Sequence, residues 1–247
     1  MTIKDKFKKF FASVENVFAK EYECISCGRE IVDGTAFQLC EKCMAKIELI
    51  EGKTCAKCGD KLSDNGSLVC DHCKDFDYAF TKNFSCCYYD DVSATIIKNL
   101  KYNGRKYIAK HIAELLEKQT DAFENIDIIT FVPISKKRER MRGFNQSEEI
   151  AKFLGEFKNI PVRNLLIKKY EGKHQAKLSQ ADRLKNLIGS FDACDSEDIK
   201  NKNILIIDDV FTTGTTLSEC AKTLLNGKPK SVSTLTFAKT RYIAENF

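Results

Sequence analysis

The sequence predicts an α/β fold, with a mostly parallel sheet covered by helices on both faces, preceded by a small cysteine-rich module. Short apolar runs alternate with amphipathic stretches from residue 84 onward, the order expected when helices join parallel strands. Eight of the twelve cysteines lie before residue 74 in closely spaced pairs. A chain of 247 residues is long enough for a sheet domain of common size and for this module.

The period of the apolar residues places the predicted elements. Apolar runs predict strands at 84–89, 127–133, 203–207 and 231–238. Apolar residues three or four positions apart predict helices at 92–101, 107–118, 147–157 and 215–225. This alternation places the sheet domain at 85–247 and a linker at 75–84, after a cysteine-rich domain at 23–74.

The first 22 residues predict an amphipathic helix. Phe7, Phe11 and Phe18 recur at helical spacing, and lysines occupy much of the remaining surface. The segment is too interrupted by charge to be a signal peptide or a membrane span, so we expect a cytoplasmic protein. The helix can pack on its own protein, on a partner or on a membrane surface, and packing on its own protein is the ordinary use of such a face.

The paired cysteines predict two structural zinc ions. Four CxxC pairs follow one another, as expected when two knuckles fold over one tetrahedral ion. Their members are Cys24, Cys27, Cys40, Cys43, Cys55, Cys58, Cys70 and Cys73. Disulfides and a redox dithiol are the alternatives, but four pairs in succession exceed what a dithiol catalyst needs. Sequential sets of four are expected, with crossed pairing as the alternative, and His72 is a bystander or a substitute ligand.

The segment ILIIDDVFTTGTT at 204–216 predicts a phosphate-binding turn. A buried strand runs into two carboxylates and then into hydroxyls around Gly214, just before a helix. Backbone N–H groups at a helix N-terminus attract an anion, and the threonine hydroxyls add donors. Asp208 and Asp209 can accept hydrogen bonds from sugar hydroxyls or bind magnesium. The plain alternative is a buried strand ending in a capped turn.

This segment resembles the signature of type I phosphoribosyltransferases, which bind phosphoribosyl pyrophosphate (PRPP). LKYNG at 100–104, RGFNQ at 142–146, Gln175, Arg183 and Asn186 narrow the resemblance to the ComF family of competence-associated proteins. The resemblance implies a type I phosphoribosyltransferase fold after a double zinc ribbon, catalytic roles for Asp208 and Asp209, and magnesium bound with PRPP. The PRPP-binding residues that it implies are Val210, Thr212, Thr213, Gly214, Thr215, Thr216, Ser135, Lys136, Lys137 and Arg142.

Two classes of function remain open at this point. The ComF resemblance implies DNA uptake or natural transformation beside a helicase-like partner, and in that case the pocket binds PRPP or a ribose-5-phosphate nucleotide without turnover. The alternative is a magnesium-dependent phosphoribosyltransferase of nucleotide metabolism with an unidentified acceptor. The net charge is +5, and basic residues cluster at 135–142 and 160–190, where they can neutralise pyrophosphate or contact single-stranded DNA. A solvated basic face is the alternative. The acceptor is expected to meet a hood at 160–192, in which no residue identifies it.

Overall fold

The computed structural model describes residues 22–31, 36–62, 66–123, 125–169, 189–194 and 197–241. The chain divides into two compact units, Met1–Lys46 and Ile47–Phe247. The division falls between the two cysteine tetrads, so that the second tetrad belongs to the same unit as the sheet. The predicted N-terminal helix and most of the predicted hood lie outside the described residues, and the domain boundaries at 74 and 85 stay a prediction.

The described part of the first unit is a small cysteine-rich fold. Strands β1 (Tyr22–Glu23) and β2 (Glu30–Ile31) pair antiparallel, and they are followed by the short helices η1 (Ala36–Gln38) and α2 (Glu41–Met44). Its described buried residues are three cysteines and three apolar residues: Cys24, Cys40, Cys43, Ile31, Phe37 and Leu39. So small an apolar core agrees with folding that depends on bound metal.

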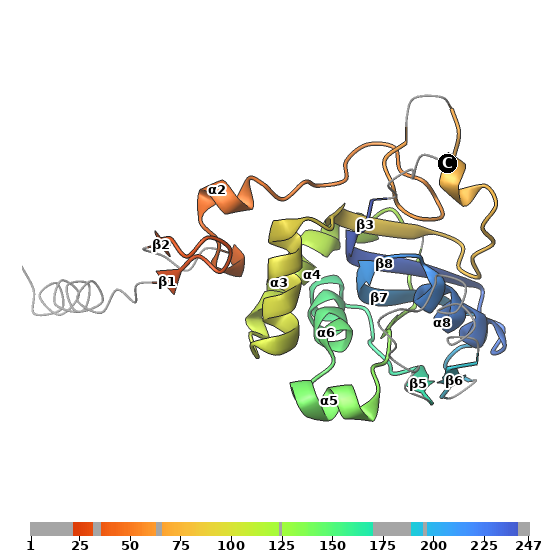
Figure 1. Cartoon of the computed structure of the whole chain (residues 1–247). Coiled ribbons are helices and arrows are strands. Elements are labelled where there is room, and N and C mark those ends of the chain that lie inside the picture. Colours follow the sequence, from red (N-terminus) through yellow and green to blue (C-terminus); the bar gives the residue numbers. More distant parts are fainter. Residues whose placement is uncertain are drawn as a thin grey trace, which may run out of the picture. The chain divides into compact units, whose positions relative to one another are not determined.

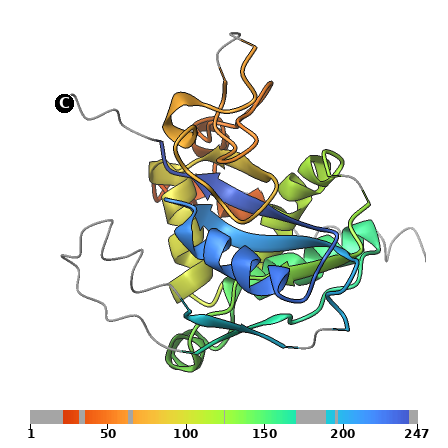
Figure 2. The same ribbon diagram turned by 90° about the vertical axis from the view of Figure 1, so that its right-hand side faces the viewer.

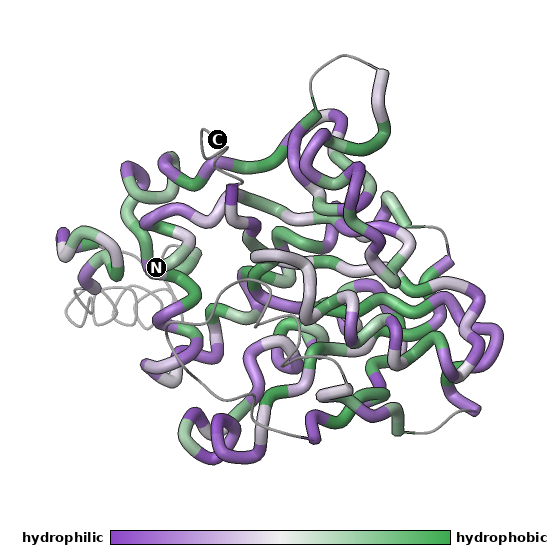
Figure 3. Tube along the Cα trace, turned by 45° about the vertical axis from the view of Figure 1, so that its right-hand side comes forward, coloured by the Kyte–Doolittle hydropathy of each residue, from purple (hydrophilic) through white to green (hydrophobic). Residues whose placement is uncertain are grey.

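The second unit is built on a four-stranded parallel sheet. Its order is β3 (Asn83–Tyr88), β8 (Ser231–Lys239), β7 (Asn203–Phe211) and β4 (Ile128–Phe131). All three neighbouring pairs are parallel. Most of β4 and residues 204–207 of β7 are apolar, as expected for a sheet buried on both faces. Figure 3 shows hydrophobic stretches of the trace between hydrophilic ones.

Helices cover both faces of this sheet. Helix α8 (Thr215–Leu225) packs on one face, where Leu217 and Ala221 share a core cluster with Ile204 and Ile206 of β7. Helices α3 (Asp91–Tyr102), α4 (Tyr107–Thr120) and α6 (Gln146–Lys158) lie on the other side (Figures 1 and 2). The predicted α/β fold is therefore confirmed. None of the described helices has the length and apolar character needed to span a membrane.

The structure also contains elements that the period of apolar residues does not predict. Helix α5 (Lys136–Arg142) has no buried residue, so it gives no amphipathic signal. Strands β5 (Leu166–Lys168) and β6 (Phe191–Ala193) form a short antiparallel ribbon, and η2 (Asp71–Cys73) is a single turn. Strand β7 runs four residues past the predicted end at 207, because β8 continues to pair with it as far as Phe211.

Candidate functional site

Asp208 lies at the centre of the polar site at the carboxyl end of β7. Its Oδ1 accepts hydrogen bonds from the Ser147 hydroxyl at 2.8 Å and from the backbone N–H of Asp209 at 2.9 Å. Burial and the neighbouring charge of Asp209 raise the pKa of Asp208 to about 7, and the bond from Ser147 opposes this rise. Asp208 therefore changes charge near neutral pH.

Asp209 is buried and is held as an anion by Lys101. The Lys101 ammonium, on the last turn of α3, forms an ion pair with Oδ2, while Gln146 Nε2 lies 3.5 Å from Oδ1. Burial acts to raise the pKa of Asp209, but the charge of Lys101 and the hydrogen bonds from Lys101, Asp208 and Gln146 together outweigh it, so that the pKa lies below its ordinary value. The pKa values of the two adjacent carboxyl groups thus shift in opposite directions, because Lys101 forms its ion pair with Asp209, whereas on Asp208 its charge only offsets part of the effect of burial.

The segment from Thr212 to Thr216, which we call the hydroxyl loop, lies at the start of α8. Gly214 is the N-cap residue with φ +73°, a left-handed conformation that favours glycine, and it has no side chain to accept from the first-turn N–H groups. Thr212 is exposed, and Thr213 Oγ1 lies 2.9 Å from Thr215 Oγ1. The helix start therefore offers backbone and hydroxyl donors to an anion.

The RGFNQ segment connects helix α5 to the carboxylate pair. Arg142 donates to Gln146 Oε1 at 3.0 Å, and the same Gln146 approaches Asp209. The Arg142 guanidinium also lies over the Tyr102 ring, 5.0 Å from its centroid, and donates to the Tyr102 hydroxyl at 3.2 Å. Asn145 caps α6 by accepting from the Ser147 N–H. LKYNG and RGFNQ, distant in sequence, therefore meet beside Asp209.

The structure brings some of the predicted site residues together and places others apart from them. It places Asp208, Asp209 and the loop Thr212 to Thr216 at one end of β7 and connects Arg142 to them. Ser135 caps α5, with its hydroxyl accepting from Arg138 N–H at 3.3 Å, whereas Lys136 and Lys137 are exposed on that helix. Val210, partly buried, pairs with Ala238 within the sheet.

Three residues at the site had no predicted role: Lys101, Gln146 and Ser147. Lys101 and Gln146 lie inside the two motifs that carried the family resemblance, so the motifs contained the signal. Ser147 is the first residue of the helix predicted at 147–157, and nothing in its local sequence indicates that its hydroxyl reaches Asp208 across the fold.

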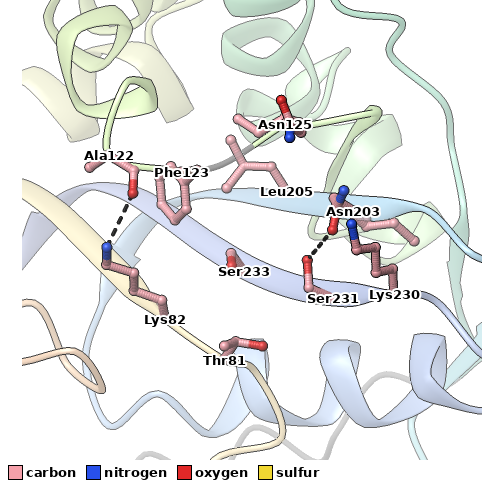
Figure 4. Close-up of a pocket in the computed structure, with 12 residues that line it drawn as sticks. Thr81, Lys82, Ala122, Phe123, Asn125, Asn203, Leu205, Lys230, Ser231 and Ser233 are labelled. Atoms are coloured by element: carbon pink, nitrogen blue, oxygen red, sulfur yellow. Dashed lines mark hydrogen bonds between the residues drawn. The ribbon is translucent and has the colours of Figure 1, made fainter.

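A cavity of about 370 Å³ lies at the other end of the sheet. It is lined by residues from the amino ends of β7 and β8, including Asn203, Ser231 and Ser233, together with Lys82 and Phe123 (Figure 4). Ligands of open α/β sheets bind at the carboxyl ends of the strands. Because this cavity lies at the amino ends, it is remote from the carboxylate pair and is not part of that site.

Each cysteine tetrad fits a tetrahedral zinc ion. The sulfur atoms of Cys24, Cys27, Cys40 and Cys43 lie within 4.8 Å of one another, and so do those of Cys55, Cys58, Cys70 and Cys73. Zn–S bonds of about 2.3 Å place tetrahedral sulfurs about 3.8 Å apart. The structure has 3.8 Å between the sulfurs of Cys27 and Cys40 and 3.7 Å between those of Cys58 and Cys70. The grouping is sequential.

Backbone N–H groups support the same two sites. Cys40 N–H donates to Cys24 Sγ at 3.4 Å, and Cys70 N–H donates to Cys55 Sγ at 3.3 Å. Such bonds stabilise sulfur as a thiolate, the form that binds zinc. When bound, zinc would supply cross-links between knuckles, since four cysteines complete its coordination and leave no open position for chemistry.

Two known protein families match parts of this chain. The family described as "Phosphoribosyl transferase domain" matches residues 100–242, which include both motifs and the hydroxyl loop. The chain belongs to this phosphoribosyl transferase family. The family described as "Double zinc ribbon domain" matches residues 14–74, and this agrees with structural zinc at the two tetrads.

Several known proteins align with most of the length of this chain. Competence protein F of Haemophilus influenzae is 27% identical over 82% of the chain and 90% of its own length. Competence protein ComFC of Bacillus subtilis is 28% identical over 82% of the chain and 85% of its own length. The DNA utilization protein YhgH of Escherichia coli K12 is 24% identical over 82% of the chain and 90% of its own length. The predicted resemblance to the ComF family is confirmed.

Proposed function

We propose that the chain binds PRPP with Mg²⁺ at the carboxyl end of β7. The observation that carries the proposal is the arrangement of two adjacent carboxyl groups, one bonded to Ser147 and the other paired with Lys101, directly before a hydroxyl loop at a helix N-terminus. In this assignment, the loop Thr212 to Thr216 holds the 5′-phosphate, and Asp208 and Asp209 bind the ribose hydroxyls. Arg142 supplies positive charge toward the pyrophosphate, and Lys136 and Lys137 remain candidates for the same role.

The chemistry that such a site supports is substitution at C1′ of the ribose. The bond from C1′ to pyrophosphate breaks, a bond from C1′ to the acceptor forms, and pyrophosphate leaves. Positive charge develops on the ribose in the transition state, so the Asp209 carboxylate, kept ionised by Lys101, stabilises it electrostatically. Mg²⁺ keeps most of its water and binds phosphates, so it would neutralise the leaving pyrophosphate rather than fill a protein cage.

We propose further that this activity or binding serves DNA uptake or the use of external DNA. The names of three relatives support this role, since two are competence proteins and one is a DNA utilization protein. The exposed basic helix α5 offers single-stranded DNA a place to bind beside the site. The second candidate is a magnesium-dependent phosphoribosyltransferase of nucleotide metabolism, and the reactive site itself supports it equally well.

PRPP binding is tested by calorimetry with Mg²⁺ on the wild type and on the double variant Asp208→Asn, Asp209→Asn. The amides keep the shape but remove the anionic acceptors, so affinity should fall by a factor of about ten or more if each bond contributes ~1.5 kcal/mol. Asp192→Asn is the matched control, because its side chain is 56% exposed on the β5–β6 ribbon. Equal affinity in the wild type and the double variant would remove the assignment.

The DNA role is tested by charge reversal on α5. Replacing Lys136, Lys137 and Arg140 with Glu should weaken binding of single-stranded DNA and lower its salt slope by about 2, since each contact with single-stranded phosphate contributes about 0.7. The control reverses Lys222, Lys228 and Lys230, which are exposed on α8 and the turn before β8 and give the same change in net charge. Absence of DNA binding by the wild type at low salt, with pyrophosphate released by a base or amine from an acceptor panel, would favour the metabolic enzyme.

A further inference from the structure

Tyr78 lies against the hydroxyl loop. Its hydroxyl donates to the Thr213 carbonyl at 3.0 Å. A Cβ added to Gly214 would come within 2.7 Å of Tyr78 Cε1, which means that the ring contacts the loop backbone closely. The next residue, Ala79, donates its N–H to the Ser218 hydroxyl at 3.0 Å, in the first turn of α8. A segment outside the sheet therefore holds the loop in place.

Stacked rings connect Tyr78 to the second tetrad. Phe76 stacks on Tyr78 with 6.0 Å between ring centroids, and Tyr78 stacks on Phe80 at 4.9 Å. On its other side, Phe76 stacks at 4.9 Å on His72, which lies within the last CxxC pair of the tetrad. The rings continue beneath the loop, where Phe211 meets Tyr78 edge-on at 6.0 Å.

Both knuckles of the second tetrad hold the same residue, Phe76. Lys57, between Cys55 and Cys58, donates its ammonium to the Phe76 carbonyl at 2.6 Å. The Phe76 N–H donates to the Cys73 carbonyl at 3.3 Å, in the other knuckle. The distance between the knuckles therefore fixes Phe76, and through Phe76 it fixes Tyr78.

The second tetrad is also attached to the sheet. Asn83 of β3 donates its side-chain amide to the Cys58 carbonyl at 3.0 Å. Lys239, fully buried at the end of β8, forms an ion pair at 2.9 Å with Asp60, to which the Tyr88 hydroxyl donates at 2.7 Å. The first tetrad belongs to the other compact unit.

We infer that Tyr78 is a positioning residue for the phosphate-binding loop, and that the second tetrad, when it holds its metal, keeps Tyr78 in place. The inference rests on the proposed binding of PRPP, and it gives the two zinc sites different roles. Loss of metal from the second tetrad frees the knuckles to separate, so Phe76 and Tyr78 no longer hold the loop in its binding conformation. Affinity then falls in proportion to the fraction of molecules whose loop remains competent.

The test compares the third cysteine of each tetrad in the full chain. Cys70→Ser should release about one zinc, reduce PRPP affinity about tenfold or more, and speed amide exchange at 212–218. Cys40→Ser should release about one zinc as well, but change neither PRPP affinity nor exchange in that segment. Because Cys70→Ser can also unfold the second unit, Tyr78→Phe is measured in parallel with Tyr89→Phe, whose side chain is 39% exposed, as its control.

Tyr78→Phe keeps the ring and both zinc ions but removes the bond to Thr213, so PRPP affinity should fall about three- to tenfold and exchange at 212–218 should rise. Equal effects of Cys70→Ser and Cys40→Ser on exchange would overturn the inference, as would unchanged exchange in Tyr78→Phe. A wild type that fails to bind PRPP would instead contradict the proposed function. The exchange data would still decide whether Tyr78 orders the loop.

Discussion

The raised pKa of Asp208 predicts a distinctive dependence of stability on pH. The folded-state pKa of about 7 exceeds the ordinary value of 3.8, so the folded protein holds a proton that the unfolded chain releases. The contribution is therefore fully present below pH 3.8 and is lost as pH rises through about 7. Replacing Asp208 with Asn removes this titration while keeping the size of the side chain.

The magnitude follows from the two pKa values. Between pH 6 and pH 8, the wild type should lose about 1 kcal/mol of unfolding free energy relative to Asp208→Asn. This window avoids more acidic conditions, in which protonation of the cysteines would release zinc. Asp209 contributes with the opposite sign, since its lowered pKa gives stability that is lost only as pH falls, below this window.

Urea unfolding at pH 6, 7 and 8 measures the effect directly, because the midpoint multiplied by the slope m gives the free energy at each pH. Asp192→Asn, with a largely exposed side chain, controls for the loss of one carboxylate and should run parallel to the wild type. Parallel curves for the wild type and Asp208→Asn would refute the account of the carboxylate pair, because no proton would then be retained on folding.

Three further predictions concern the charge, the loop and the metals. Lys101→Met should lower the unfolding free energy by about 1–3 kcal/mol, since it leaves the buried Asp209 without its cation; an unchanged urea midpoint would contradict this. Gly214→Val should cost about 2 kcal/mol or more and abolish PRPP binding, because its Cβ would lie 2.5 Å from Phe211 Cζ at φ +73°, whereas Gly66→Val has open space at φ +77° and should be milder. Metal analysis of the purified protein should give two zinc ions per chain, and a value well below one, with oxidised cysteines, would contradict the ribbon assignment.

The sheet was predictable from sequence because its strands are buried on both faces. The apolar runs that form β4 and the first half of β7 contain few polar residues, so they differ clearly from the helices. Helix α5 was not predictable in this way, since a helix with no buried residue leaves no periodic pattern. The end of β7 was set by pairing with β8 beyond residue 207, an interaction that local sequence does not contain.

The site was predictable where its residues are contiguous and not where the fold assembles it. The carboxylate pair and the hydroxyl loop follow one another in the chain, so their sequence alone predicts a phosphate-binding turn. Lys101, Ser147 and Tyr78 come from three other segments, and each reaches the site through tertiary contacts. The unequal charges of Asp208 and Asp209 depend on these contacts and cannot be inferred from two adjacent aspartates.

The position of β8 between β3 and β7 has a consequence for the newly made chain. Among the strands of the described residues, β3 pairs only with β8, although about 150 residues of chain are synthesised between them. Asp60, beside the second tetrad, likewise cannot form its ion pair until Lys239 has been synthesised. A ribosome must therefore deliver nearly the whole polypeptide before this unit can close, and any chain that stops short of Ser231 leaves β3 and β7 without the strand that joins them.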